Sequence, residues 1–191
     1  MTSYTGEMRP VDTPTWRTRD IVVTAVIAVA FGVVFAALNA AWPALEILGP
    51  ARYILYGTWL LPAVVAPLIV RKPGAALFAE MVAASLSVLL VNQWGPSALL
   101  SGFVQGVGAE AVFALARYRN WTWPVVVAAA LASTTAAWVH DWYFWFPTAS
   151  IDFMLTLGAF MAISAVVLMP LVAFALVRSL REAGVLEGFP A

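Results

Sequence analysis

The sequence predicts an all-α integral membrane protein with six transmembrane helices and with its N and C termini in the cytoplasm. The first observation behind this prediction is composition, because 63% of the 191 residues are hydrophobic, only 10% are charged and the mean hydropathy is +0.90. Soluble domains usually carry about 25% charged residues, and a chain of this size cannot hide so much apolar surface from water. The other two observations are the spacing of the apolar runs and the placement of the basic residues.

Six apolar runs are long enough to cross a bilayer as helices. A helix rises about 1.5 Å per residue, so about 20 residues cover a hydrocarbon core of about 30 Å. The first run exceeds the apolar core of a signal peptide, which is about 7–15 residues long, and we interpret it as an uncleaved span. The predicted spans are residues 20–41, 53–70, 75–91, 97–116, 122–140 and 153–177.

Polar or turn-forming segments separate these spans. The breaks are, in chain order, a loop at 42–52 with two prolines, Arg71 to Gly74, Asn92 to Pro96, Arg117 to Asn120, and an aromatic-rich loop at 141–152. One membrane domain, residues 20–177, therefore lies between polar tails at 1–19 and 178–191.

The basic residues determine the predicted orientation. With six spans, all but one of the ten basic residues fall on the side of the termini, and only Arg52 falls on the other side. Cytoplasmic loops carry the excess of Lys and Arg, so we expect cytoplasmic termini and external loops at 42–52, 92–96 and 141–152. The expected location is the plasma membrane of a prokaryote, as a multi-pass protein in the lipid bilayer.

Composition also excludes several functions. There is no cysteine and only one histidine, which rules out thiolate chemistry and a multi-histidine metal site. The net charge of zero implies no nucleic-acid partner. No G-x-x-x-x-G-K-[ST] motif is present, so ATP hydrolysis would need separate ATPase subunits. We predict no enzyme activity, no cofactor and no metal.

The fourth span carries the main candidate site residues. Gln105 and Glu110 lie within it, with Gly102 and Gly106 between them on one helix face at about 100° per residue. A carboxylate within a span is costly unless it faces a cavity or a partner. We therefore predict that Gln105 and Glu110 line a ligand site, although helix packing explains the glycines equally well.

Glu80 in the third span is the second carboxylate candidate. It lies at a depth similar to that of Glu110 on the preceding antiparallel helix, so the two could share a site or serve only structure. Further candidate ligand-binding residues lie near the predicted outer ends of the spans, where aromatic faces would suit a flat or cationic ligand. They are Tyr53, Tyr56, Trp59, Asn92, Trp94, His140 and Trp142. Membrane anchoring explains the tryptophans and a structural role the histidine at least as well.

Small residues recur at intervals of four along the first span. Ala28, Gly32 and Ala36 form a stripe that permits close contact between helices. The contact would be either with a neighbouring helix of the same chain or with another membrane subunit.

Three segments of the chain resemble one family. They are RKPGAALFAE at 71–80, the pattern N-x-x-G-P at 92–96 and GF-x-QG-x-GAE at 102–110. They resemble YkoE-type proteins, the substrate-binding S components of energy-coupling factor (ECF) transporters for thiamin or its hydroxymethylpyrimidine precursor. The resemblance covers most of the chain and is most specific over residues 71–119.

The resemblance implies a six-helix subunit that captures its vitamin from outside and docks on a transmembrane coupling subunit driven by two ATPase subunits. It also implies that the small residues Ala28, Gly32 and Ala36 form the docking face. A glutamate could pair with the aminopyrimidine, and aromatic faces could hold the cationic thiazolium. Two alternatives remain open: a stand-alone secondary transporter that uses the intramembrane glutamates, and a structural membrane protein.

Overall fold

The computed structural model describes residues 15–190, and within that part of the chain all regular structure is helical. Most of the predicted N-terminal tail, residues 1–14, lies outside the described residues. The elements are α1 (Thr18–Ala41), η1 (Trp42–Leu60), α2 (Pro62–Val70), α3 (Ala75–Leu90), α4 (Ser97–Leu115), α5 (Trp123–Phe144), α6 (Ile151–Ile163), η2 (Ser164–Leu168) and α7 (Met169–Glu182).

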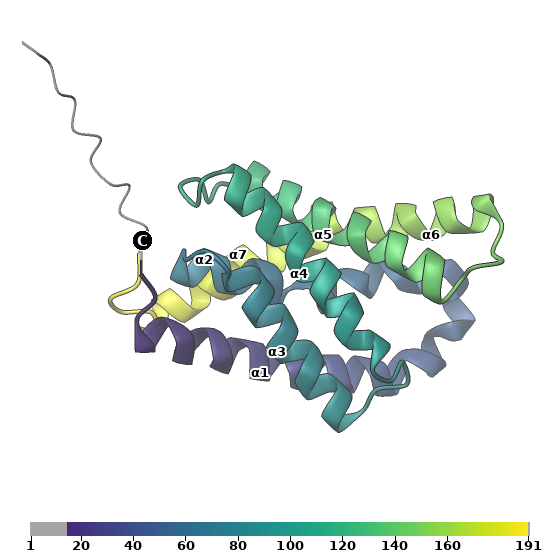
Figure 1. The fold of residues 1–191 in the computed structure, drawn as a ribbon, viewed down its shortest axis with the longest axis horizontal. Coiled ribbons are helices and arrows are strands. Elements are labelled where there is room, and N and C mark those ends of the chain that lie inside the picture. Colours follow the sequence, from purple (N-terminus) through teal and green to yellow (C-terminus); the bar gives the residue numbers. More distant parts are fainter. Residues whose placement is uncertain (1–14, 191) are drawn as a thin grey trace, which may run out of the picture.

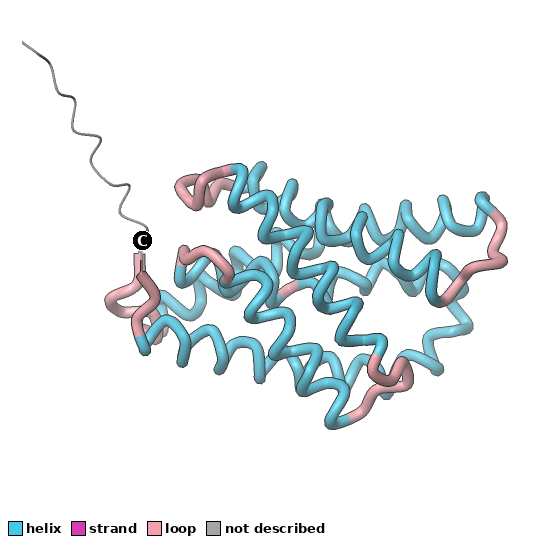
Figure 2. Tube along the Cα trace, viewed as in Figure 1, coloured by secondary structure: helices cyan, strands magenta, loops and turns pink. Residues whose placement is uncertain are grey.

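The helices run back and forth along the long axis of the molecule (Figure 1). The start of α1, the α2–α3 turn, the α4–α5 turn and the end of α7 lie at one end, which we call the terminal end. The α1–η1 junction and the α3–α4 and α5–α6 turns lie at the opposite end, which we call the loop end, so the non-helical turns gather at the two ends (Figure 2). This arrangement agrees with the order of turns expected from the sequence.

Four continuous helical stretches are long and apolar enough to cross a membrane. They are Thr18–Val70, Ser97–Leu115, Trp123–Phe144 and Ile151–Glu182, whereas α3 has 16 residues and is shorter. The six separate crossings therefore remain a prediction from the sequence.

The segment expected to be a loop at 42–52 is helical instead. It forms the first part of η1, a 3₁₀ stretch that is interrupted at Gly49, where φ is 53° and ψ is −138°. Residues other than glycine avoid this backbone conformation. Pro50, directly after Gly49, has no N–H with which to continue a helix from the preceding residues. The chain therefore changes direction inside η1 without an extended loop.

Helix α2 forms the centre of the bundle, and every residue from Pro62 to Val70 is buried. It packs against α1, α3, α4 and α7. A helix that is apolar on all sides suits such a position. Its end is fixed by Arg71, which adopts a left-handed conformation with φ of 51°.

Helices α6 and α7 are joined by the π-helical segment η2. Pro170 follows it, and proline lacks the N–H that would continue the regular hydrogen-bond ladder. Ser164 in this segment accepts a hydrogen bond from the backbone N–H of Gly57 at 2.9 Å. The wide turn thus supplies a polar contact to η1.

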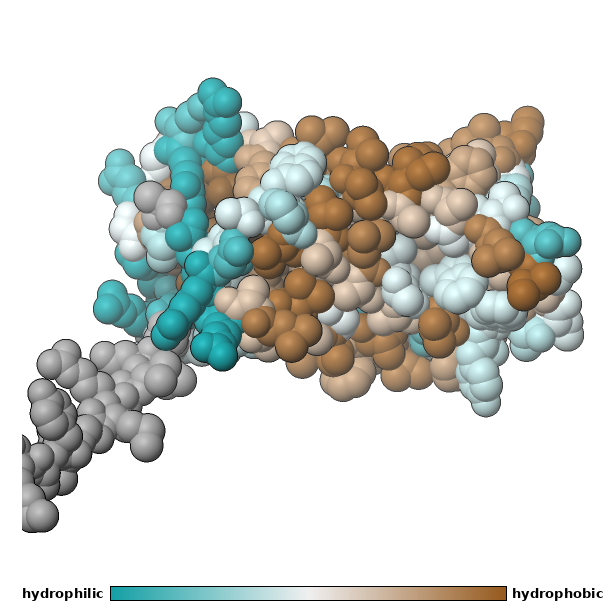
Figure 3. Space-filling view, turned by 90° about the horizontal axis from the view of Figure 1, so that it is seen from above, coloured by the Kyte–Doolittle hydropathy of each residue, from teal (hydrophilic) through white to brown (hydrophobic). Residues whose placement is uncertain are grey.

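The surface divides into zones along the long axis (Figure 3). Hydrophilic residues gather at the terminal end, next to the grey tail, and hydrophobic residues cover the middle. Exposed apolar side chains in this zone include Val26, Val33, Val107, Leu155 and Val167. Such a belt is the surface that a bilayer requires.

Candidate functional site

A cavity that is partly open to solvent lies among α1, η1, α3, α4 and α5, toward the loop end. Apolar and aromatic walls with a few convergent polar groups are the usual form of a small-molecule site. The walls of this cavity combine aromatic and polar side chains: Phe35, Asn39, Trp42, Tyr53, Tyr56, Trp59, Glu80, Ala84, Ser87, Asn92, Trp94, Ala98, Ser101, Gly102, Gln105, Asp141, Trp145 and Phe146.

Glu80 provides the acidic group at the inner end of the cavity. It lies ten residues before the end of α3 at Leu90, which corresponds to about 15 Å along a helix. The residue is completely buried, and its Oε2 accepts a hydrogen bond from the backbone N–H of Ala63 at 3.2 Å. Its Oε1 has no hydrogen-bond partner. A buried carboxyl oxygen without a donor is costly, so Glu80 retains capacity to accept a hydrogen bond from a ligand.

Two glycines of α4 bring that helix close to Glu80. A Cβ at Gly102 would lie 2.7 Å from Ala84 Cβ, and a Cβ at Gly106 would lie 2.9 Å from Leu77 Cα. Both distances are too short for a side chain, so these glycines permit direct packing of α4 on α3. The face also carries Gln105, which lines the cavity and donates from Nε2 to Ser101 Oγ at 2.7 Å.

A polar network connects three walls of the cavity. Asn39 donates from Nδ2 to Ser87 Oγ and to the Val91 carbonyl, both at 3.0 Å. Its Oδ1 accepts from Trp59 Nε1 at 3.1 Å. Asn92 also donates to Ser87 Oγ, at 3.2 Å. These bonds hold α1, η1 and α3 in fixed positions around the cavity.

The opposite wall is aromatic and comes largely from η1. Tyr53 and Tyr56 are stacked with ring centroids 6.0 Å apart, and Trp42 meets Trp59 edge to face at 4.7 Å. Trp94 and Trp145, from the two other turns at the loop end, meet at 5.0 Å. Such rings offer flat faces for stacking and negative potential for a cation.

Asp141 adds a second carboxylate to the lining. Its Oδ2 accepts from the Tyr56 hydroxyl at 2.9 Å, and its Oδ1 lies 3.0 Å from Nδ1 of His140. His140 itself does not line the cavity, and its ring stacks on Phe144 at 4.8 Å. His140 thus contacts the lining residue Asp141 but does not itself reach the cavity.

Glu110 does not reach the cavity, contrary to its predicted place beside Glu80. Its Oε1 accepts from the backbone N–H of Gly74 at 2.6 Å and from the Tyr118 hydroxyl at 2.7 Å, and its Oε2 accepts from the Ala76 N–H at 3.0 Å. Burial, followed by the hydrogen bond to Glu110, raises the pKa of Tyr118 above its usual value, so the phenol remains a donor. Glu110 therefore fixes the α2–α3 turn to α4 at the terminal end.

Some of the predicted ligand-binding residues line the cavity and others, like Glu110, do not. Seven of the predicted ligand-binding residues line the cavity: Tyr53, Tyr56, Trp59, Glu80, Asn92, Trp94 and Gln105. Trp142 does not, because its ring packs on Trp138 at 5.0 Å. The three residues that the structure leaves outside the cavity are Glu110, His140 and Trp142.

The small-residue stripe of α1 faces the interior of the chain. Ala28, Gly32 and Ala36 are buried, and a Cβ at Gly32 would lie 2.9 Å from Leu86 Cβ and 3.0 Å from the Ala83 carbonyl. Helix α3 of the same chain covers the stripe. Docking of another subunit on these residues would require α1 to separate from α3.

Several lining residues were not predicted from the sequence. Asn39 carried a usable signal, because an amide inside an apolar span is itself a candidate for function. Asp141 is the exception, since it stands beside His140 among the polar candidates at the outer ends of the spans. Adjacent residues of a helix do not share a face, and only Asp141 of this pair lines the cavity. Trp42, Trp145 and Phe35 carried no signal that separates them from membrane anchors or core residues.

Comparisons with known proteins agree with this architecture. A family model described as the ABC-type cobalt transport system, permease component, matches residues 19–136. The chain is 35% identical over 176 residues to YkoE of Bacillus subtilis (strain 168), whose name describes it provisionally as an HMP/thiamine permease; the match covers 91% of this chain and 88% of that protein. A solved structure titled as the crystal structure of an S-component of an ECF transporter superposes with a TM-score of 0.87, at 34% identity, covering 91% of this chain and 90% of the other.

The fold and these comparisons define the class: this is a membrane S component of an ECF transporter. Within that class, the chain belongs to the family of YkoE. Its relatives are transport subunits rather than catalytic enzymes. Cobalt in the description of the family model has no counterpart in the described residues, which contain no group of three or more His, Cys, Asp or Glu side chains placed to hold a metal ion.

Proposed function

We propose that this chain captures thiamin or its hydroxymethylpyrimidine precursor in the cavity at the loop end, as the substrate-binding subunit of an ECF importer. The loop end would face the outside, since the helix ends and turns at the terminal end hold all the basic residues of the described chain except Arg52, and positive charge marks the cytoplasmic side. The coupling subunit and two ATPase subunits would be separate chains.

The observation that carries the proposal is the free Oε1 of Glu80 in a cavity with aromatic walls. An aminopyrimidine presents an exocyclic amine beside a ring nitrogen, and a carboxyl group can bond to both. A buried polar group without its hydrogen bond costs about 1–3 kcal/mol, so such a ligand would be favoured at the free Oε1. Gln105 and Ser101, on the adjacent face of α4, offer further polar partners for the ring.

The aromatic wall favours a ligand with a second, cationic ring. The stacked Tyr53 and Tyr56, together with Trp59, would attract a thiazolium by up to about 2 kcal/mol when water is excluded. Asp141, behind Tyr56, adds negative potential to the same wall. We therefore expect thiamin to bind more tightly than the pyrimidine alone.

Isothermal titration calorimetry of the purified protein tests the proposal. Thiamin and hydroxymethylpyrimidine should bind with one-to-one stoichiometry, and a thiazole without the pyrimidine should bind much more weakly. The absence of heat and of thermal stabilisation with both pyrimidine compounds would refute the proposed substrate class.

The stand-alone transporter has no observation in its favour. That alternative needed Glu80 and Glu110 to act together, but Glu110 accepts three hydrogen bonds from the chain and does not line the cavity. Uptake in vesicles supplies the direct test, because an ECF subunit should require its coupling and ATPase partners.

Docking of the coupling subunit through Ala28, Gly32 and Ala36 is a proposal for a state in which α1 separates from α3, because α3 covers these residues here. Gly32→Leu, which would also meet Leu86 within the chain, should weaken co-purification with the coupling subunit, whereas Ala30→Leu, at an exposed position on the same helix, is the matched control. If only Ala30→Leu abolished co-purification with the coupling subunit, the docking face would be the exposed side of α1 instead. Substrate affinity and thermal unfolding of both variants separate docking from misfolding.

A further inference from the structure

A second hollow, open to solvent, lies at the terminal end of the molecule, whereas the candidate substrate cavity lies toward the loop end. Its lining combines guanidinium groups with apolar side chains: Leu68, Arg71, Trp121, Phe174, Val177, Arg178, Arg181 and Glu182. None of these residues belongs to the candidate substrate site.

Arg71 is the cation in this hollow that lacks a partner. Its Nε is buried and has no hydrogen-bond partner in the described structure, and its guanidinium lies 5.9 Å from the centre of the Trp121 ring. Burial and the nearby charge of Arg181 lower the pKa of Arg71. A partly buried guanidinium beside a second positive charge is stabilised by an anion that approaches both.

The other charged groups of the hollow do not supply that anion. Glu182 accepts from Arg178 Nε at 2.7 Å, so its charge is already matched. Arg181 donates to the Pro190 carbonyl at 2.9 Å, which carries no net charge. Three guanidinium groups therefore face a single carboxylate in the lining.

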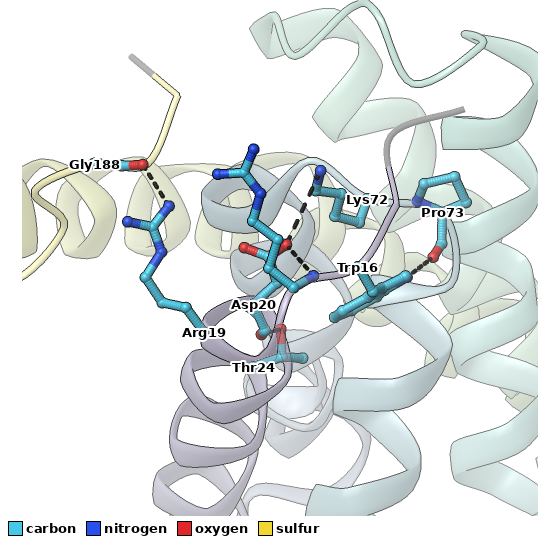
Figure 4. Close-up of polar contacts among 8 residues, drawn as sticks. Trp16, Arg19, Asp20, Thr24, Lys72, Pro73 and Gly188 are labelled. Atoms are coloured by element: carbon cyan, nitrogen blue, oxygen red, sulfur yellow. Dashed lines mark hydrogen bonds and ion pairs between the residues drawn. The ribbon is translucent and has the colours of Figure 1, made fainter. Parts of the chain in front are cut away.

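A neighbouring hollow is also basic and shares Arg71 with the first, but one of its cations has a carboxylate beside it. It is lined by Arg17, Arg19, Asp20, Arg71 and Lys72, among others. There Lys72 Nζ lies 4.0 Å from Asp20 Oδ2, and Arg19 donates to the Gly188 carbonyl (Figure 4). Asp20 therefore pairs with Lys72 in that hollow, whereas among the described residues no carboxylate lies within ion-pair distance of Arg71 or Arg181.

The apolar half of the hollow indicates what kind of anion fits. Leu68, Phe174 and Val177 line it, and Phe174 stacks on Trp123 at 5.4 Å. Trp123 is 43% exposed and Leu171, on the same helix as Phe174, is 55% exposed. Apolar side chains thus extend from the hollow toward the hydrophobic belt, a path that suits an acyl chain and gives no advantage to a free inorganic ion.

We propose that this hollow binds the phosphate of an anionic phospholipid, with Arg71 and Arg181 on the headgroup and Phe174 beside the first part of an acyl chain. Arginine matches phosphate oxygens by paired hydrogen bonds, and basic pockets between helices near a membrane surface are suited to anionic headgroups. The proposal is independent of the substrate bound at the loop end.

Native mass spectrometry of the protein, purified with phosphatidylglycerol or phosphatidylcholine, tests the site. The wild-type protein should retain phosphatidylglycerol and lose phosphatidylcholine. The double variant Arg71→Gln/Arg181→Gln should retain at least about tenfold less phosphatidylglycerol, because each cation removed lowers retention by about fivefold. Arg119→Gln, an exposed arginine at the same end that lines neither hollow, is the matched control and should retain the lipid.

The remaining arms determine the source of the phosphate. Inorganic phosphate should neither displace the lipid nor raise the unfolding temperature; if it does both, the site binds free anions and the lipid proposal is wrong. Equal loss of lipid in Arg119→Gln would show diffuse charge attraction and would also overturn it. If the double variant fails to fold, Arg181→Gln alone, at an exposed position, should still lower retention by about fivefold.

Discussion

Glu80 and Glu110 occupy equivalent positions in the sequence but serve different purposes in the structure. Each lies five residues from the terminal end of its helix, Ala75 at the start of α3 and Leu115 at the end of α4. Glu110 accepts hydrogen bonds from three donors, whereas Glu80 accepts one and keeps an oxygen free. Their positions along the two helices are alike, so what separates the two side chains is the number of donors that the chain itself supplies.

The strongest test of this contrast is Glu80→Gln. The amide keeps the size of the side chain but places an N–H₂ group, which only donates, where a carboxyl oxygen would accept. We expect thiamin affinity to fall by about tenfold to a hundredfold, because a buried hydrogen-bonding group left unsatisfied costs about 1–3 kcal/mol. Calorimetry measures this directly, and Ser85→Ala, at an exposed position on α3, is the control. Unchanged affinity would remove Glu80 from the site.

Glu110→Ala tests the other half of the comparison. The change leaves the N–H groups of Gly74 and Ala76 without their acceptor at the start of α3, where a helix has no internal partners for them. We expect a loss of about 2 kcal/mol in stability and substrate affinity close to that of the wild type. Thermal unfolding in detergent and calorimetry on the same sample provide both values. A large loss of affinity at unchanged stability would return Glu110 to the list of ligand contacts.

Tyr56→Phe is expected to have the smallest effect. It removes the hydroxyl that donates to Asp141 but keeps the ring that stacks on Tyr53. A single neutral donor contributes about 1 kcal/mol, so affinity for thiamin should change only a few-fold. The pyrimidine alone should be affected even less, since it lacks the cationic ring. An effect as large as that of Glu80→Gln would place the principal polar contact at Asp141 instead.

Composition and hydropathy were sufficient to predict an all-helical membrane protein. The resemblance at residues 71–119 was sufficient to predict the family, which the comparisons confirm. The helical form of residues 42–52 was not predicted, because Pro43, Gly49 and Pro50 are typical of loops. In the structure, Pro43 lies in the first turn of the helical segment and Gly49 bends it.

The site was predicted in part, for a physical reason. Periodicity places residues on helix faces, but it does not say which neighbouring backbone groups point toward them. Glu110 lies beside the α2–α3 turn, and the free N–H groups of that turn are invisible in a pattern of apolar and polar residues. The aromatic residues of η1 were found because their spacing of three persists in a 3₁₀ helix, where residues three apart share a face.

The π-helical turn at Ser164–Leu168 corrects the angular phase of the last membrane segment. In an unbroken helix at about 100° per residue, Met169, Ala173 and Val177 would drift about 60–140° around the axis from Met154. The additional residue of the wide turn rotates them back by about 100°, and all four side chains are buried in the same bundle. One surplus residue thus lets a single long segment keep one seam against its neighbours from the loop end to the terminal end.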